Sequence, residues 1–358
     1  MTAGLLQLPR ALRLQQSSGT FRLSSLRQSV AAARRSSSSL SRPQQWRRAD
    51  LQVVASGQDQ ILRSISDNGQ VSVLVIQGTD LVKEACRRHK TAPTAGAALG
   101  RALLGTLLMA SFREEGEKTQ VTWRGDGPIG SIQVIADAMG MVKGKVGNPG
   151  CNPPLRQDGK FNVGGAVGRG VLAVVRSLPF TKEGWQTPYT GMTAIKTGEI
   201  AEDLAEYILE SEQTQCAMGL GVSIGRDLEV NAAGGFLVQV LPFAEEETLS
   251  QLEKNIIDAG SVSSMLRDGL SARDITGKIL NGLGVSDTGF TLTPTYGPCE
   301  AAALRDRMAS AVATLGEEEV KSILEEQGKI EVTCEFCRDT YNFEEEEIMA
   351  MVRAAENP

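Results

Sequence analysis

The sequence Ile330-Glu-Val-Thr-Cys-Glu-Phe-Cys337 carries the most structural information in this chain. Apolar side chains alternate along it at positions 330, 332 and 334, which predicts a β-strand that ends at a Cys-x-x-Cys pair. Cys334 and Cys337 can bind one face of a zinc ion or close a disulfide. A structural zinc ion needs four ligands, so the pair by itself leaves zinc binding, disulfide formation and two buried thiols open.

Two amphipathic helices are predicted upstream of this strand. The first carries apolar residues at i, i+4, i+8 and i+11, namely Leu304, Met308, Val312 and Leu315. Gly316 is expected as its C-cap. The second places Val320, Ile323 and Leu324 on one side. Together with the strand, these helices predict a small C-terminal domain over residues 299–358.

A different pattern fills residues 244–298. An amphipathic helix is predicted where apolar residues recur at i, i+3, i+7 and i+8, namely Leu249, Leu252, Ile256 and Ile257. Glycines then interrupt a run of short helical patterns between residues 260 and 284. Apolar faces without a large core can unfold locally at low cost, so we expect a helical linker of weak local stability.

Residues 50–243 alternate strand and helix patterns. The stretch Thr94–Phe112 is apolar nearly all round, but Arg101 at its centre and its modest length favour a buried core helix over a membrane span. Further elements are predicted as strands at Val71–Ile76, Val121–Trp123, Ile132–Ile135, Gly170–Arg176 and Leu237–Leu241 and as a helix at Glu199–Ser211. We expect an α+β protein with an α/β core domain, a helical linker and a small C-terminal domain.

Two other features of the core segment have ordinary interpretations. Asp80 is expected to cap a helix that runs to His89, the only histidine, which is expected at the surface. The glycines of Val163–Gly170 resemble a phosphate-binding loop, but a strand pattern follows them where a helix is required. They are expected to be turn and bulge residues.

Composition excludes several classes of protein. A single histidine among 358 residues excludes HExxH zinc sites and Cys2His2 zinc fingers. Nine of the 37 basic residues and none of the 43 acidic residues lie in 1–49, which leaves a net charge of −15 for residues 50–358. An acidic body repels phosphate backbones, so nucleic acid is not an expected partner.

The first 49 residues have the composition of an organellar transit peptide. They contain nine arginines, ten serines and no acidic residue, and they lack the apolar core of a secretory signal. The serine run Ser36–Ser39 favours the chloroplast, with the mitochondrion as the alternative. We therefore expect residues 1–49 to be removed after import.

The motifs resemble, in order, those of the 33 kDa chaperonins, a family of redox-regulated heat-shock chaperones. The C-terminal likeness comprises Leu315–Val320, Ile323-Leu324, Cys334-x-x-Cys337, Tyr341 and Phe343. The upstream likeness comprises Gly125-Asp-Gly-Pro128, Tyr189-x-Gly191, Gly198–Ala205, Ser211–Gln213 and Ala233–Pro242. It extends over roughly residues 50–350, nearly the whole chain after the transit peptide.

This resemblance implies a core domain at 50–243, a linker at 244–298 and a redox-switch domain at 299–358. In the family, a Cys-x-Cys and a Cys-x-x-Cys hold one zinc ion in the reduced, inactive protein. Oxidants form disulfides, zinc leaves, and the small domain and linker unfold. The exposed apolar surface then holds unfolding client proteins without ATP. The implied client-binding surface includes the linker face Leu249, Leu252, Ile256 and Ile257.

This chain departs from the family pattern at the Cys-x-Cys motif. Ungapped alignment through Arg305-Asp-Arg307 places Ala301 and Ala303 at its two positions. The implied redox-active and metal-binding residues are therefore Cys299, Cys334 and Cys337. Glu300, Asp339 or water would have to be the fourth zinc ligand, so zinc is expected to bind weakly or not at all. The remaining cysteines, Cys86, Cys151 and Cys216, are expected to be buried, inert fillers.

The leading hypothesis is a redox-linked holdase, not an enzyme, whose partners are unfolded client proteins. The first alternative is a constitutively active chaperone with a weakened zinc lock. The second is a zinc-ribbon nucleic-acid-binding protein, against which the acidic body argues. No membrane association is expected, and homodimer formation on oxidation is one expected outcome.

Overall fold

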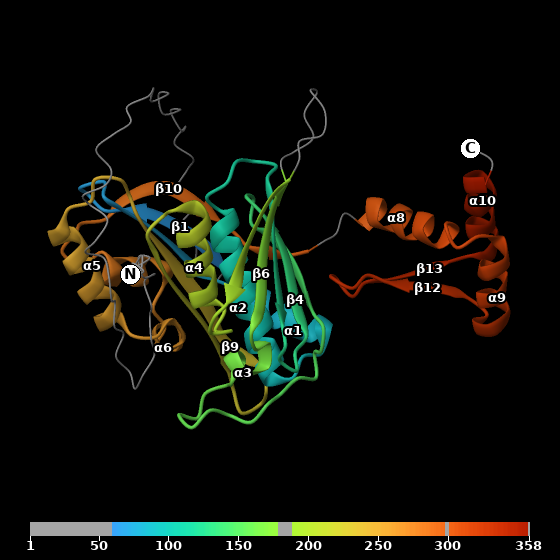
Figure 1. Cartoon of the computed structure of the whole chain (residues 1–358), viewed down its shortest axis with the longest axis horizontal. Coiled ribbons are helices and arrows are strands. Elements are labelled where there is room, and N and C mark those ends of the chain that lie inside the picture. The colour runs from blue at the N-terminus through green and yellow to red at the C-terminus, as the bar shows by residue number, and fades with distance from the viewer. Residues whose placement is uncertain (1–58, 178–187, 298–300, 357–358) are drawn as a thin grey trace, which may run out of the picture.

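The computed structural model describes residues 59–177, 188–297 and 301–356, and shows a mixed α+β protein, as expected. The expected transit peptide, Cys299 and Glu300 lie outside the described residues. Figure 1 shows two sheets with helices between them and, to one side, a small C-terminal domain whose strand hairpin extends toward the core.

Two antiparallel sheets form the core. The five-stranded sheet has, in spatial order, β10 (Ser286–Leu292), β1 (Gln60–Ile65), β2 (Val71–Gln77), β9 (Val230–Val240) and β8 (Cys216–Ile224). The six-stranded sheet has β11 (Thr295–Tyr296), β5 (Met141–Val146), β4 (Ser131–Asp137), β3 (Lys118–Gly125), β6 (Gly170–Ser177) and β7 (Tyr189–Ile195). Only the β11–β5 pair in this sheet is parallel. All five strands predicted in the core segment are confirmed.

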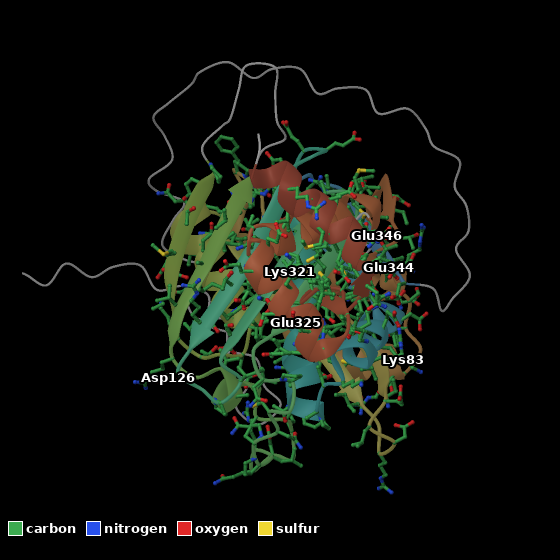
Figure 2. All side chains as sticks on the ribbon, turned by 90° about the vertical axis from the view of Figure 1, so that its right-hand side faces the viewer. Lys83, Asp126, Lys321, Glu325, Glu344 and Glu346 are labelled. Atoms are coloured by element: carbon green, nitrogen blue, oxygen red, sulfur yellow. The ribbon has the colours of Figure 1, made fainter. Side chains whose placement is uncertain are left out.

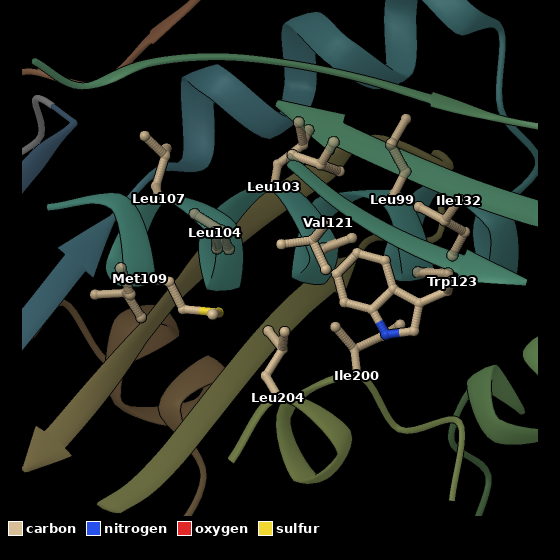
Figure 3. Close-up of a cluster of buried hydrophobic side chains, with 14 of the residues drawn as sticks. Leu99, Leu103, Leu104, Leu107, Met109, Val121, Trp123, Ile132, Ile200 and Leu204 are labelled. Carbon is tan, nitrogen blue, oxygen red and sulfur yellow. The ribbon is translucent and has the colours of Figure 1, made fainter. Parts of the chain in front are cut away.

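Three helices lie between the two sheets: α1 (Thr79–His89), α2 (Pro93–Ala110) and α4 (Ala201–Glu212). Helix α2 contacts both sheets, which explains why its sequence is apolar on every side and confirms the predicted core helix. Figure 3 shows its leucines packed among side chains from the strands and from α4, including Leu99, Leu103, Val121, Trp123 and Leu204. The one cation in α2, Arg101, pairs with Glu199 at 2.7 Å. In the described part of the chain, no helix has both the length and the hydropathy to cross a bilayer.

Strand β2 shows how the linker completes the core. Its side chains are buried on both faces, which explains its continuous apolar run. Leu74 and Ile76 join the cluster around α2, whereas Val73 and Val75 face outward to a second cluster. That second cluster is covered by the linker helices α5 (Glu246–Ala259), α6 (Val262–Arg267) and α7 (Ala272–Ile279).

The linker expected at 244–298 is helical only as far as Ile279. Ser261 accepts a hydrogen bond from the Ser264 N–H at the start of α6, and Ser271 forms a capping box with Asp274 at the start of α7. The chain then forms β10, which pairs with β1, and β11, which pairs with β5. The end of the linker therefore adds one strand to each core sheet.

Three local predictions were wrong. The α1 N-terminus is held by Asp59, whose carboxylate accepts hydrogen bonds from the N–H groups of Asp80 and Leu81 at 3.1 and 2.7 Å. The glycine stretch contains a short helix, α3 (Val163–Val167), with Asn162 as its N-cap. Gly316, with φ of +88°, is the N-cap of the helix that follows it.

The C-terminal domain comprises α8 (Ala301–Ala313), α9 (Glu317–Gln327), β12 (Ile330–Thr333), β13 (Thr340–Phe343) and α10 (Glu345–Glu356). It has its own core, built around Val312, Val320, Ile330, Phe343 and Ile348. Figure 2 looks onto this domain, from which Lys321, Glu325, Glu344 and Glu346 project. The predicted helices and strand of this domain are confirmed.

Candidate functional site

The predicted cysteine pair lies in the turn of the β12–β13 hairpin, here called the cysteine loop (residues 334–339). Cys334 N–H donates to the Asp339 carbonyl at 2.9 Å, and Arg338 N–H donates to the Cys334 carbonyl at 2.8 Å. Both cysteines are buried, and Leu304, Met308, Phe336 and Tyr341 pack around them. The strand therefore delivers the pair into a small apolar pocket, as the alternating pattern predicts.

The sulfur atoms of Cys334 and Cys337 are 3.8 Å apart. A disulfide bond is about 2.05 Å long, so these two sulfurs are not bonded to each other. Two thiolates on one tetrahedral zinc ion, with Zn–S bonds of about 2.3 Å, lie about 3.8 Å apart. Cys337 is disulfide-bonded in this structure, so the spacing would suit half of a zinc site only after that disulfide is reduced.

The other half of such a site is not found among the described residues. They contain no group of three or more His, Cys, Asp or Glu side chains arranged to hold a metal. The Asp339 carboxylate, one candidate ligand, pairs with Arg88 at 3.1 Å. The described side chains do not fit a closed structural site with four ligands.

The cysteine loop is docked on the core domain. Arg88, at the C-terminal end of α1, donates from one Nη1 to the Cys337 carbonyl at 3.0 Å and to Asp339 at 3.1 Å. The Phe336 carbonyl lies 2.7 Å from the Tyr296 hydroxyl and 3.0 Å from His89 Nε2. Two consecutive loop carbonyls therefore meet donors from α1 and β11.

His89 is buried, which corrects the expectation of a surface position. Its Nε2 lies 2.9 Å from the Tyr296 hydroxyl as well as near the Phe336 carbonyl. Burial lowers the pKa of His89, so the ring is neutral at pH 7 and has one N–H to donate. Burial raises the pKa of Tyr296, so its hydroxyl keeps its proton.

Lysines from β5 surround the aromatic ring of the loop. The ammonium groups of Lys143 and Lys145 lie 5.8 and 5.3 Å from the centre of the Phe336 ring, within cation–π range. Lys145 also pairs with Glu335. The loop and the core are thus complementary in charge as well as in hydrogen bonding.

The linker face proposed to bind clients is covered in this structure. Leu252 and Ile256 are buried in the cluster that includes the outer face of the five-stranded sheet. Leu249 is buried against Ala244, and Ile257 is half-buried. Of the four side chains, only that of Ile257 is partly exposed in this structure.

Glycines in the five-stranded sheet let α6 approach closely. A Cβ atom on Gly221 would lie 2.8 Å from the Ser263 backbone nitrogen, and one on Gly234 would lie 2.5 Å from Leu266. Larger residues at these positions would push α6 off the sheet.

The core cysteines match their predicted role as inert fillers. Cys151 and Cys216 are buried, and Cys86 is partly buried. Burial raises the pKa of each, that of Cys216 to about 12. A thiol that stays protonated is a poor nucleophile, so none of these three is a reactive group.

The core side of the docking contact could not be predicted from the sequence. No motif marks Tyr296, and Arg88 and Lys145 are ordinary surface cations in sequence. The one available signal was the run Arg87-Arg88-His89 in the last turn of α1, whose side chains can donate hydrogen bonds to carbonyl groups and carboxylates. Which partner it meets depends on a segment about 250 positions away along the chain.

Comparisons with known proteins show which family the sequence and the fold resemble. A family model described as "Hsp33 protein" matches residues 59–344. The 33 kDa chaperonin of Geobacter sulfurreducens is 40% identical over 291 residues, covering 81% of this chain and 93% of the relative. The 33 kDa chaperonin of Shouchella clausii is 38% identical over 302 residues, covering 84% of this chain and 99% of the relative.

One solved structure extends the likeness to the fold. The crystal structure of a 33 kDa chaperonin (heat shock protein 33 homologue) from Thermotoga maritima superposes with a TM-score of 0.75 at 32% identity. The match covers 84% of this chain and 99% of that one. The similarity thus extends over most of this chain and nearly all of that one.

Proposed function

The chain belongs to the Hsp33 family of chaperones, and from this premise we propose that it is an ATP-independent holdase that binds unfolding client proteins. The observation that carries the proposal is the apolar outer face of the five-stranded sheet. Val73 and Val75 of β2 and Phe236 and Val238 of β9 lie there under the linker helices. Lifting the linker would uncover a continuous apolar surface, which is how a binding site for unfolded chains is built.

Separation of the linker helices from this surface should require a modest free energy. Helices α6 and α7 have only 6 and 8 residues. Isolated helices shorter than about 12 residues are marginal in water, so α6 and α7 depend on the sheet for their stability. We propose that the linker face Leu249, Leu252, Ile256 and Ile257 joins the sheet in binding clients once both are exposed.

Oxidation of the cysteine set Cys334, Cys337 and Cys299 is the proposed trigger. Two thiols lose two protons and two electrons as a disulfide forms, and hydrogen peroxide accepts them and leaves as two water molecules. The new bond changes the cysteine loop and loosens its domain. A homodimer is the proposed assembly of the oxidised protein.

Zinc would stabilise the C-terminal domain only weakly. Cys334 and Cys337, with Cys299, would hold it, and the metal would supply folding energy to the C-terminal domain when bound. With at most three thiolates, we propose that zinc is weakly held. A constitutively active chaperone is the second candidate, favoured by Ala301 and Ala303 at the Cys-x-Cys positions.

The test is suppression of aggregation of a heat-unfolded client by the full chain, without ATP, followed by light scattering. We expect the oxidised protein to suppress scattering and the reduced protein to do so several-fold less. Equal suppression in both states would favour the constitutive alternative, and none in either state would refute the holdase.

The client surface is tested by replacing Leu249, Leu252, Ile256 and Ile257 together by Ser. Lys254→Ser with Asp258→Ser, on the exposed side of the same helix, is the matched control. We expect weaker holding by the oxidised apolar-face variant and unchanged holding by the control. Unchanged holding by both would place the client site elsewhere.

A further inference from the structure

The hairpin of the C-terminal domain touches the core through the cysteine loop (Figure 1). Three core side chains receive it: Arg88 and His89 at the end of α1, and Tyr296 in β11. They are here called the clamp. Their acceptors are the carbonyl oxygens of Phe336 and Cys337, which lie inside the Cys-x-x-Cys turn or at its end, and the Asp339 carboxylate.

The clamp holds the loop by its backbone. Backbone carbonyls move whenever the turn changes shape, whatever the side chains do. Cys337 is disulfide-bonded in this structure, whereas Cys334 keeps its thiol, and the two sulfur atoms lie 3.8 Å apart. Attack of the Cys334 thiolate on the Cys337 sulfur would break the present disulfide, release its other cysteine as a thiolate, and draw the sulfur atoms of Cys334 and Cys337 to about 2.05 Å apart. The Phe336 carbonyl lies between these two residues, so it cannot keep its place through such a change.

The hydrogen bonds of Tyr296 make the clamp reversible. Its hydroxyl has a single proton but two acceptors in reach, the Phe336 carbonyl at 2.7 Å and the Gly144 carbonyl at 3.0 Å. When the loop leaves, the hydroxyl can donate to Gly144, and His89 can donate to the Tyr296 oxygen at 2.9 Å. Undocking therefore leaves neither buried group without a partner, which keeps its cost low.

We propose that Arg88, His89 and Tyr296 are positioning residues that hold the cysteine loop on the core and couple its state to the linker. The proposal rests on the proposed holdase function and names the contact through which that function is regulated. Tyr296 lies in β11, a few residues after β10, and both strands close the linker onto the core sheets. Release of the loop removes support from β11 and so from the linker.

Docking can be measured without any client. The Lys145 ammonium and the Glu335 carboxylate are in direct contact across the interface, so a zero-length carbodiimide should join them by an amide bond. The yield of that cross-linked peptide, determined by mass spectrometry on the full chain, reports the docked fraction. The hydrogen bonds donated by the Arg88 guanidinium contribute enough free energy to docking that their loss should lower the docking equilibrium constant about tenfold.

The variants are Arg88→Gln, Tyr296→Phe and His89→Leu. Arg87→Gln is the matched control, because Arg87 pairs with Glu84 as Arg88 does but has no recorded bond to the loop. His89→Gln is the conservative variant, since it restores an N–H donor. We expect cross-linking to fall in the three variants and to stay near wild type in Arg87→Gln and His89→Gln.

Holding activity of the same samples, measured in the reduced state, separates the two proposals. We expect it to rise at least fivefold in the three clamp variants and not in the two controls. Unchanged cross-linking in the clamp variants, or lost cross-linking without a rise in activity, would overturn the clamp while leaving oxidant-dependent wild-type activity intact. Wild type inactive in both redox states would instead refute the holdase, whatever the cross-link shows.

Discussion

In the reduced protein, Cys334 and Cys337 would supply two ligands of a tetrahedral site, and the described residues hold no group of three or more side chains arranged to complete it. Each missing thiolate weakens zinc binding, because oxygen ligands or an open position are typical of labile sites. We expect less than one zinc ion per reduced chain and rapid loss to a mild chelator. Metal quantification during chelator competition checks this.

The matched variants for this prediction are Cys334→Ser and Cys86→Ser. Cys334→Ser removes a ligand and should abolish the remaining zinc binding. Cys86→Ser alters a core cysteine and should leave zinc binding unchanged. A full zinc ion per chain, held as tightly as by four thiolates, would contradict the weak site and require a ligand not yet identified.

Glu202 should make stability depend on pH. Burial raises the pKa of this carboxyl to about 7, with Glu199 and Asp203 adding repulsion. The folded state therefore favours the proton, and its contribution is full below pH 4.5 and is lost as pH rises through about 7. We expect Glu202→Gln to unfold like wild type at pH 4 but to be about 2 kcal/mol more stable at pH 8.

Urea unfolding at the two pH values measures this difference. Glu210→Gln, with an exposed carboxylate on the same helix, should change the unfolding free energy by less than about 0.5 kcal/mol at either pH. A Glu202→Gln variant that is less stable than wild type at pH 8 would contradict the prediction and show that the carboxylate form is the stabilising one.

At the scale of elements, the contact between α6 and the sheet controls exposure of the apolar face. Gly221→Ala would place a Cβ 2.8 Å from the Ser263 backbone and should cost about 1 to 3 kcal/mol of linker docking. We expect greater holding by the reduced protein and faster amide exchange in α6. Gly277→Ala, at an open helical site in α7, should instead stabilise by about 0.5 kcal/mol.

A Gly221→Ala variant with exchange rates and reduced-state holding equal to wild type would show that α6 tolerates the added methyl group. The close approach of α6 to Gly221 would then contribute nothing to linker docking.

Most elements could be predicted from periodicity, because their burial is set by near neighbours in the chain. The apolar run of Val71–Ile76 and the apolar helix around Arg101 both indicated burial on every side. The cap of α1 could not be predicted. Asp59, which accepts a hydrogen bond from Leu81 N–H, is separated from α1 in the sequence by strands β1 and β2. Strands β10 and β11 were missed because their sequence is largely polar and they pair at sheet edges.

The candidate site was predictable in part. The strand that ends at the Cys-x-x-Cys pair follows from local pattern alone, but the second strand of the hairpin, β13, was not predicted. The burial of His89 was not predictable, because it results from a tertiary contact with Phe336. A lone histidine at a helix end carries no local signal that distinguishes a surface position from an interface.

At the scale of the whole molecule, residues 1–49 differ in charge from the rest of the chain. Residues 1–49 hold nine arginines and no acid, while the rest of the chain carries a net charge of −15. We expect residues 1–55 fused to a fluorescent reporter to enter an organelle, the chloroplast by preference and the mitochondrion as the alternative. Microscopy of the fusion checks this, and a cytosolic reporter would contradict it.

The central claim is that the linker helices leave the five-stranded sheet when the protein becomes an active holdase. Amide hydrogen exchange on the full chain, reduced and oxidised, with holding assayed in the same samples, tests it most directly. We predict that oxidation removes protection from α5, α6 and α7, while α2 stays protected between the sheets. Holding activity that appears with all three linker helices still protected would contradict the account.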